Sequence, residues 1–179
     1  MRRVRILCLA LLASVATPAA AQSADADQPI RIQANAATLD DRRNVAVYTG
    51  NVIITQGSMR LTGSRVTLTL DNAGDVQKLV STGSPATFRQ TPAGGNQVDA
   101  RAQTIEYHAD TERVVLIEQA FLEQAGNTFQ GQRVNYDIQR QVVDAGRATA
   151  EDGESSERVE IIIQPRSRGS EPASNDDET

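Results

Sequence analysis

Side chains for redox, nucleophilic or metal chemistry are scarce in this sequence. It contains one cysteine, Cys8, and one histidine, His108, among 179 residues. Cys8 falls in an N-terminal segment that we expect to be removed, so the remaining chain can form neither a disulfide nor a thiolate metal site. A single histidine cannot build an imidazole-rich zinc site either. We therefore predict no metal and no cofactor, and a fold that rests on packing and backbone pairing.

Catalytic motifs are missing as well. No Gly-x-Ser-x-Gly element accompanies His108, and no Walker or dinucleotide-binding glycine loop is present. Acidic residues fall in expected turns, such as 40–41 and 71–75, and nothing marks a carboxylate pair of the kind that hydrolyses glycosides. We predict no catalytic residue and a protein that is not an enzyme.

Positive charge is also limited. The formal net charge is −5, and removing the three N-terminal arginines with the first segment would leave −5 − 3 = −8. Binding to nucleic acid depends largely on neutralising phosphates, so a chain this acidic is a poor candidate for it. We predict no nucleic-acid partner.

The first 21 residues have the composition of an export signal. Arg2, Arg3 and Arg5 precede a short apolar run over 6–15, which is too short to span a bilayer, and small residues follow at 19–21. We predict cleavage before Gln22. The alternative is an uncleaved N-terminal anchor.

Composition also divides the rest of the chain. Pro165 ends the last expected strand, and residues 167–179 are polar and acidic, with no aliphatic side chain larger than alanine and no aromatic one, which predicts a disordered tail over 165–179. Residues 22–28 are predicted to be a flexible leader for the same reason. Between them we expect one domain over 29–164.

Short runs of alternating apolar and polar residues recur from about Ile30 to Ile163 and predict an all-β domain. Turn residues separate the runs at 40–44, 49–51, 56–58, 71–75 and 81–85, and 91–96 resembles a longer loop between two halves.

An internal repeat supports two similar halves. Residues 61–68 resemble 129–136, and 52–56 resemble 120–124 at the same spacing, whereas 34–39 match 100–105 only with a two-residue slip. The repeat predicts two similar stacks of short antiparallel strands.

Aliphatic side chains must fill the interior, because the chain has no tryptophan, three phenylalanines and three tyrosines. The strands alternate between one aliphatic and one polar face. This pattern fits an ordinary closed core. It equally fits two layers that stay apart and admit hydrocarbon chains, and alternation alone does not choose between them.

Several segments resemble the LptA (OstA-like) family of periplasmic bridge proteins in lipopolysaccharide transport. The resemblance covers about 28–164 and is carried by residues 28–32, 48–57, 85–90 and 105–107 followed by 114–116. One departure is Glu118-Gln119-Ala120, where the second half would otherwise repeat Gly50-Asn51-Val52. It leaves the geometry of that turn open.

The resemblance implies a twisted antiparallel β-jellyroll, open at both ends, whose apolar groove shelters the acyl chains of lipid A. It also implies head-to-tail stacking and docking to inner-membrane LptC-like and outer-membrane LptD-like β-jellyroll domains. The short chain and the expected cleavage favour the periplasmic bridge over either membrane partner. Shielding is physically sensible, because a buried methylene is worth about 0.8 kcal/mol and a twelve-carbon chain in water costs on the order of 10 kcal/mol.

Alternation and resemblance together select eleven candidate lipid-binding residues. Each is also a candidate for plain core, and Ile30, Ile32 and Phe88 rank first because they lie in the family-like segments. The full set is Ile30, Ile32, Val52, Ile54, Leu68, Phe88, Tyr107, Leu116, Phe121, Phe129 and Tyr136. Two other functions remain open: a structural periplasmic β-repeat protein with a sealed core, and a carbohydrate-active enzyme on a β-scaffold.

Overall fold

The computed structural model describes residues 25–146 and 158–164. The predicted signal segment (1–21) and acidic tail (165–179) lie outside these ranges. Within them, no helix has the length and apolar character needed to cross a membrane. The described elements are a short 3-10 helix, η1 (Asp25–Asp27), and strands β1 (Arg31–Gln33), β2 (Ala36–Asp40), β3 (Val45–Gln56), β4 (Met59–Leu70), β5 (Val76–Gln90), β6 (Val98–His108), β7 (Arg113–Gln124), β8 (Asn127–Asp137), β9 (Val142–Ala145) and β10 (Glu160–Ile162).

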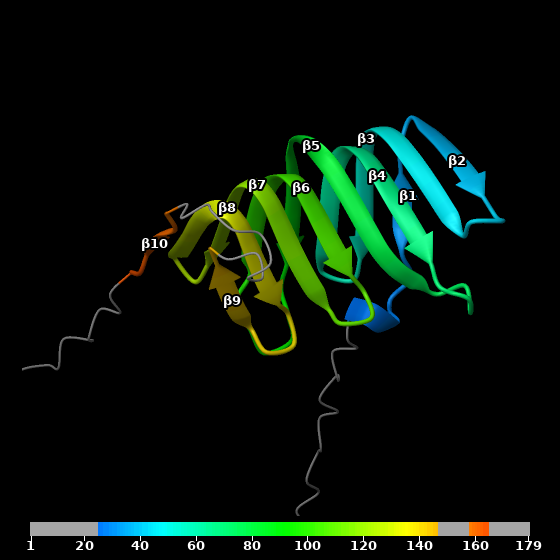
Figure 1. Ribbon diagram of the computed structural model, residues 1–179. Helices are drawn as coiled ribbons and strands as arrows, with labels where there is room; N and C mark the ends of the chain where they lie inside the picture. Colours follow the sequence, from blue (N-terminus) through cyan, green and yellow to red (C-terminus); the bar gives the residue numbers. More distant parts are fainter. Residues whose placement is uncertain (1–24, 147–157, 165–179) are drawn as a thin grey trace, which may run out of the picture.

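The strands form one antiparallel sheet in the order β1-β3-β4-β5-β6-β7-β8-β10, with β2 also paired to β3 and β9 also paired to β8. Figure 1 shows the long strands side by side in a row, with β2 at one end and β9 and β10 at the other. The long strands from β3 to β8 follow one another in the chain, so each pairing among them is a hairpin, whereas β1 pairs with β3 and β8 pairs with β10 across an intervening strand. The predicted all-β class is confirmed.

Each long strand bends near its middle. The ladders between neighbours are interrupted there, for example between Thr49 and Val52 and between Ile117 and Ala120. We call these interruptions corners. They divide the sheet into two facing layers. Layer A consists of β2, β9 and residues 45–49, 65–70, 76–82, 104–108, 113–117 and 133–137. Layer B consists of β1, β10 and residues 52–56, 59–63, 86–90, 98–102, 120–124 and 127–131.

The corner of β7 adopts the backbone of the corner of β3 although its sequence differs. Gly50 and Asn51 have φ values of 78° and 47°, and Glu118 and Gln119 have 63° and 53°. The backbone geometry of Glu118-Gln119-Ala120, which the sequence left open, is therefore that of Gly50-Asn51-Val52. A non-glycine residue in this left-handed region costs on the order of 1–2 kcal/mol, which the surrounding ladders must offset.

The prediction of chain-reversing turns at 49–51 and 81–85 is wrong, because both segments lie inside strands. The chain does not reverse at either place; β3 and β5 continue through them as bent strands. The predicted turn at 40–44 and the loop at 91–96 do separate strands, and that loop joins the two halves.

The two halves are related by a constant shift of 68 residues. Val45 pairs with Thr69 in the first half and Arg113 pairs with Asp137 in the second (113 − 45 = 137 − 69 = 68). Every residue pair between β3 and β4 recurs between β7 and β8 with this shift. The predicted repeat is confirmed, but its two-residue slip over 34–39 is wrong, because Asp40 pairs with Val45 as His108 pairs with Arg113.

Candidate functional site

The inner faces of the two layers hold most of the predicted site residues. Seven of the eleven belong to one buried apolar cluster between the layers and are at most 6% exposed. They come from β3 to β8 and alternate with outward-facing neighbours, as the period of two requires. These seven are Val52, Ile54, Leu68, Phe88, Tyr107, Leu116 and Tyr136.

Side chains from the two layers touch in the middle of the molecule. The rings of Phe88 in layer B and Tyr107 in layer A stack with centroids 6.5 Å apart. The amide of Gln124 in layer B donates a long hydrogen bond of 3.4 Å to the hydroxyl of Tyr136 in layer A. The central interior is therefore filled by side chains, and the open groove implied by the resemblance is closed here.

Three further predicted residues lie toward the ends of the sheet. Ile30 and Ile32 lie just before and on β1, Phe129 lies on β8, and all three are partly exposed while packing against the central cluster. The interior therefore remains aliphatic up to both ends, where it meets solvent.

Phe121 is placed differently from the other ten. It lies on the outer face of layer B, where the guanidinium carbon of Arg101 sits 3.6 Å from its ring centroid. Its neighbours Ala120 and Leu122 are the buried residues at this point of β7. Phe121 is therefore removed from the candidate interior.

Sequence reasoning passed over several equally buried residues. Alternation places them on the inner face once the strands are known, but only some were singled out. They include Leu61, Leu79 and Ile105, each 0% exposed.

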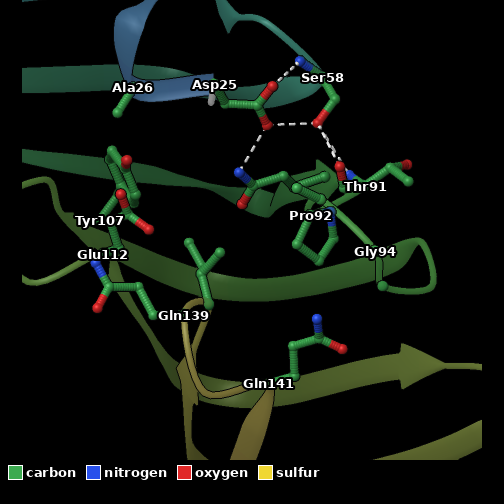
Figure 2. Close-up of a pocket in the computed structure, with 14 residues that line it drawn as sticks. Asp25, Ala26, Ser58, Thr91, Pro92, Gly94, Tyr107, Glu112, Gln139 and Gln141 are labelled. Atoms are coloured by element: carbon green, nitrogen blue, oxygen red, sulfur yellow. Dashed lines mark hydrogen bonds between the residues drawn. The ribbon is translucent and has the colours of Figure 1, made fainter. Parts of the chain in front are cut away.

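A cleft opens between the layers along the edges that lie opposite the corners. It has a volume of about 560 Å³, and its wall in layer A includes Tyr107, Glu112 and Ile138. Loops of layer B, including Ser58 and Pro92, form the facing wall (Figure 2). Tyr107, whose ring stacks on that of Phe88, therefore forms part of the cleft wall.

Residues 25–28 form an N-terminal strap beside this cleft, which Asp25 and Ala26 line. The Asp25 carboxylate accepts hydrogen bonds from the Ser58 backbone (2.7 Å), the Ser58 hydroxyl (2.5 Å) and the Gln90 amide (2.8 Å), as Figure 2 shows. The Gln56 amide donates to the carbonyls of Ala26 and Gln28. The described part of the predicted flexible leader is thus bonded to layer B. Residues 22–24 lie outside the described ranges.

The loops of the two layers come close at one point of the cleft. A side chain added at Gly95, between β5 and β6, would place its Cβ 2.8 Å from Nε2 of Gln141, between β8 and β9. The Gln124–Tyr136 hydrogen bond also links the layers on this side of the molecule, opposite the corners.

Polar groups on the outer face form ordinary ion pairs. Nζ of Lys78 lies 2.9 Å from Glu106, and Nε2 of His108 lies 3.3 Å from the same carboxylate. Burial alone would raise the pKa of Glu106, but the hydrogen bond and charge of Lys78, and then those of His108, hold it below its ordinary value. Within the described ranges, no group of three or more acidic, histidine or cysteine residues could hold a metal ion.

The buried hydroxyl of Tyr107, in the wall of the cleft, makes the folding stability of the protein depend on pH. Burial, followed by the negative charges of Glu112 and Asp25, raises the pKa of Tyr107 to about 12 from 10.0. The unfolded chain ionises first, so folding stability is complete below pH 10 and falls as pH rises toward 12. Two pKa units correspond to about 3 kcal/mol at most.

We expect Tyr107→Phe to lose less stability than the unsubstituted chain on going from pH 9 to pH 11.5. Urea unfolding at both pH values measures this difference, and the two proteins should differ by about 2 kcal/mol in that loss, because pH 11.5 still lies below the folded-state pKa. An equal loss in both proteins would show that the buried Tyr107 hydroxyl does not govern the alkaline transition.

Comparisons with known proteins agree with this architecture. A family model described as LptA/(LptD N-terminal domain) LPS transport protein matches residues 31–142. The lipopolysaccharide export system protein LptH of Pseudomonas aeruginosa is 48% identical over 152 residues, covering 84% of this chain and 87% of LptH. LptA of Escherichia coli K12 is 31% identical over 161 residues, covering 89% of this chain and 83% of LptA.

A solved structure is similar over most of the chain. The crystal structure of LptH from Pseudomonas aeruginosa, described as the LptA-homologous periplasmic component of the lipopolysaccharide transport device, matches with a TM-score of 0.71 and 46% identity. The match covers 79% of this chain and 99% of that one. On its sequence, its fold and these matches, the chain belongs to the LptA and LptD N-terminal domain family of lipopolysaccharide transport proteins.

Proposed function

We propose that this protein is a periplasmic carrier that binds lipopolysaccharide by its acyl chains and passes it from the inner to the outer membrane. The observation that carries the proposal is the continuous aliphatic interior between two layers that, within the described ranges, are joined by backbone along the corners. The names of the relatives, which are export-system proteins, support the same conclusion.

Acyl chains enter this interior when the layers part along the cleft. The bent strands act as hinges at the corners, while the opposite edges are held by side-chain contacts such as the Phe88–Tyr107 stack. Separating the stack exposes apolar surface, and an inserted hydrocarbon chain covers that surface again. Each buried methylene contributes about 0.8 kcal/mol, so a lipid with several chains can offset the opening.

Export and assembly complete the proposal. The segment over 1–21 directs the chain to the periplasm and is removed before Gln22. Copies stack head to tail through the end strands, and the terminal copies dock to LptC-like and LptD-like β-jellyroll domains. The end strands support this assembly because unpaired strand edges accept a further strand.

A second function is favoured by the filled centre of the interior. A structural protein with a permanently sealed core would show the same buried cluster. It would bind no lipid, and it would never expose Phe88.

Photo-crosslinking distinguishes the two functions. A photoreactive residue replaces either Phe88 or Phe121, two phenylalanines of layer B that face opposite ways. We expect lipopolysaccharide to be captured at Phe88 at least several-fold more than at Phe121. Ile32, near the open end, should also capture it.

Equal capture at Phe88 and Phe121 would contradict an inner binding surface. Absence of capture at both Phe88 and Ile32, with the variants folded as judged by circular dichroism, would favour the sealed structural protein.

A further inference from the structure

The Asp25 carboxylate sits among hydrogen-bond donors that belong to layer B. It accepts from the Ser58 backbone N–H (2.7 Å), the Ser58 hydroxyl (2.5 Å) and Nε2 of Gln90 (2.8 Å), as Figure 2 shows. All three residues line the cleft between the layers. Neutral N–H and O–H groups that converge on a carboxylate can equally hold a phosphate, because both offer anionic oxygens. The geometry is that of an anion site filled by a side chain of the protein itself.

The turn between β3 and β4 is shaped to admit an anion. Gly57 has a φ of 56°, and a side chain added there would collide with Oδ1 of Asp25 and place its Cβ 2.8 Å from Cγ. Glycine alone combines this backbone angle with the open space. The Ser58 hydroxyl also accepts from the Thr91 backbone N–H at 3.1 Å, which ties the turn to the loop after β5. Two loops of layer B therefore position the donors.

The N-terminal strap that carries Asp25 is more lightly attached than the strands. None of residues 25–28 is buried, and none belongs to a strand. The Gln56 amide donates to the carbonyls of Ala26 and Gln28 at 3.0 and 3.1 Å. Moving the strap away breaks polar contacts of this kind but leaves intact the buried apolar cluster, to which no strap residue belongs.

Asp25 satisfies only one of the two polar atoms of the Gln90 side chain, which is 5% exposed. A carboxylate only accepts hydrogen bonds, so Nε2 must face Asp25 and Oε1 must face away from it. Oε1 is buried and has no hydrogen-bond partner among the described residues, which is unfavourable. A phosphate with a hydroxyl beside it, as on a phosphorylated sugar, offers both an anionic oxygen for Nε2 and a donor for Oε1. Asp25 is therefore an incomplete substitute for such a group.

We propose that Asp25 occupies a binding site for a phosphate of the lipid's saccharide head group, and that the strap leaves this site when the lipid binds. This rests on the proposed carrier function and adds a contact for the polar part of the lipid. With the acyl chains inserted through the cleft, the head group stays at its mouth, beside Ser58 and Gln90. Asp25 remains tethered close to the site, so its return competes with the phosphate and favours release of the lipid.

Removing the carboxylate tests whether Asp25 blocks the site. Asp25→Ala and the matched control Asp27→Ala each remove one negative charge from the strap, but only Asp25 contacts the donors. In titrations of the full chain with lipopolysaccharide, we expect Asp25→Ala to bind at least about fivefold more tightly than the unsubstituted chain, because affinity is lowered by the fraction of molecules whose site is closed. Asp27→Ala should bind as the unsubstituted chain does.

Two further arms identify the group that is bound. The gain from Asp25→Ala should vanish with lipopolysaccharide whose phosphates have been removed by a phosphatase. It should also vanish when Gln90→Met is added to Asp25→Ala, with the fold checked by circular dichroism. Inorganic phosphate alone, followed by the Ser58 amide resonance of Asp25→Ala, should bind at least about 100-fold more weakly than lipopolysaccharide, because it buries no acyl chain.

Each contrary result overturns a stated part of the proposal. An equal gain with dephosphorylated lipid would make the strap a steric lid without an anion site, and an equal gain from Asp27→Ala would reduce the effect to general charge repulsion. No gain from Asp25→Ala would show that the site is not blocked. Tight binding of inorganic phosphate would assign the site to the free ion. Absence of lipopolysaccharide binding by every variant and by the unsubstituted chain would instead refute the carrier function, and the head-group site with it.

Discussion

Linking Gly95→Cys to Gln141→Cys is expected to abolish lipopolysaccharide capture, because the link closes the cleft between the layers. The two positions face each other across the cleft, with a Cβ at Gly95 within 2.9 Å of the terminal amide atoms of Gln141, a separation that a short bifunctional linker can span. Gln141 already has a positive φ of 54°, so cysteine there makes no new demand on the backbone. In a Cys8→Ser background, oxidation or a short bifunctional maleimide should reduce lipid capture by at least about tenfold, a loss of about 1.4 kcal/mol or more. Reduction of the disulfide should restore it.

The matched control places a link inside one layer. The hydroxyls of Thr62 and Thr87 lie 2.6 Å apart on the outer face of layer B, on directly paired residues. A Thr62→Cys, Thr87→Cys link stiffens two strands equally well but leaves the layers free to part, so capture should persist. Unchanged capture by the oxidised Gly95–Gln141 pair would mean that lipid does not enter through the cleft.

Charged end strands are expected to stop self-assembly. Ile161→Asp blocks the β10 end and Leu39→Asp blocks the β2 end, and both side chains are at least half exposed, so the fold should tolerate the change. At a joint, either carboxylate would be desolvated without a partner, which costs several kcal/mol and should weaken association by at least about 100-fold. Each variant alone should therefore stay monomeric at concentrations where the unsubstituted chain forms longer species in light scattering.

Mixing the two variants provides the decisive comparison. Ile161→Asp keeps an intact β1–β2 end and Leu39→Asp keeps an intact β9–β10 end, so the mixture should give dimers and nothing longer. Thr87→Asp, exposed on β5 and away from both ends of the sheet, is the control and should assemble as the unsubstituted chain does. Long species formed by either end variant alone would show that assembly does not use the end strands.

The strands and the inner face could be predicted because alternation with a period of two is a local signal. Val52 and Ile54 are buried, as expected from their own strand, and the shift of 68 residues carries the same phase to Ala120 and Leu122. Phe121 was selected for its size although its position between these two residues places it on the other face. Phase along the strand, not side-chain volume, decides which residues enter the interior.

The corners could not be predicted, because their local sequence resembles that of a turn. Gly50-Asn51 adopts left-handed backbone angles of the kind used in tight hairpins, yet β3 continues past them. Whether the chain reverses or bends depends on β4, whose own ladder is interrupted at the facing position. The strap at 25–28 was missed for a related reason, since a single carboxylate bonded to Ser58 and Gln90 leaves no periodic pattern.

The end strands differ from the others in one respect with a mechanical consequence. Inside the molecule, a long strand such as β5 runs through its corner and couples the two layers covalently. At either end the same position is filled by two separate short strands, β1 with β2 or β9 with β10. A filament of copies would therefore be stiff within each subunit and compliant at each joint. By flexing at these regularly spaced joints, it could follow a changing distance between two membranes. The lipid path inside each subunit would stay undisturbed.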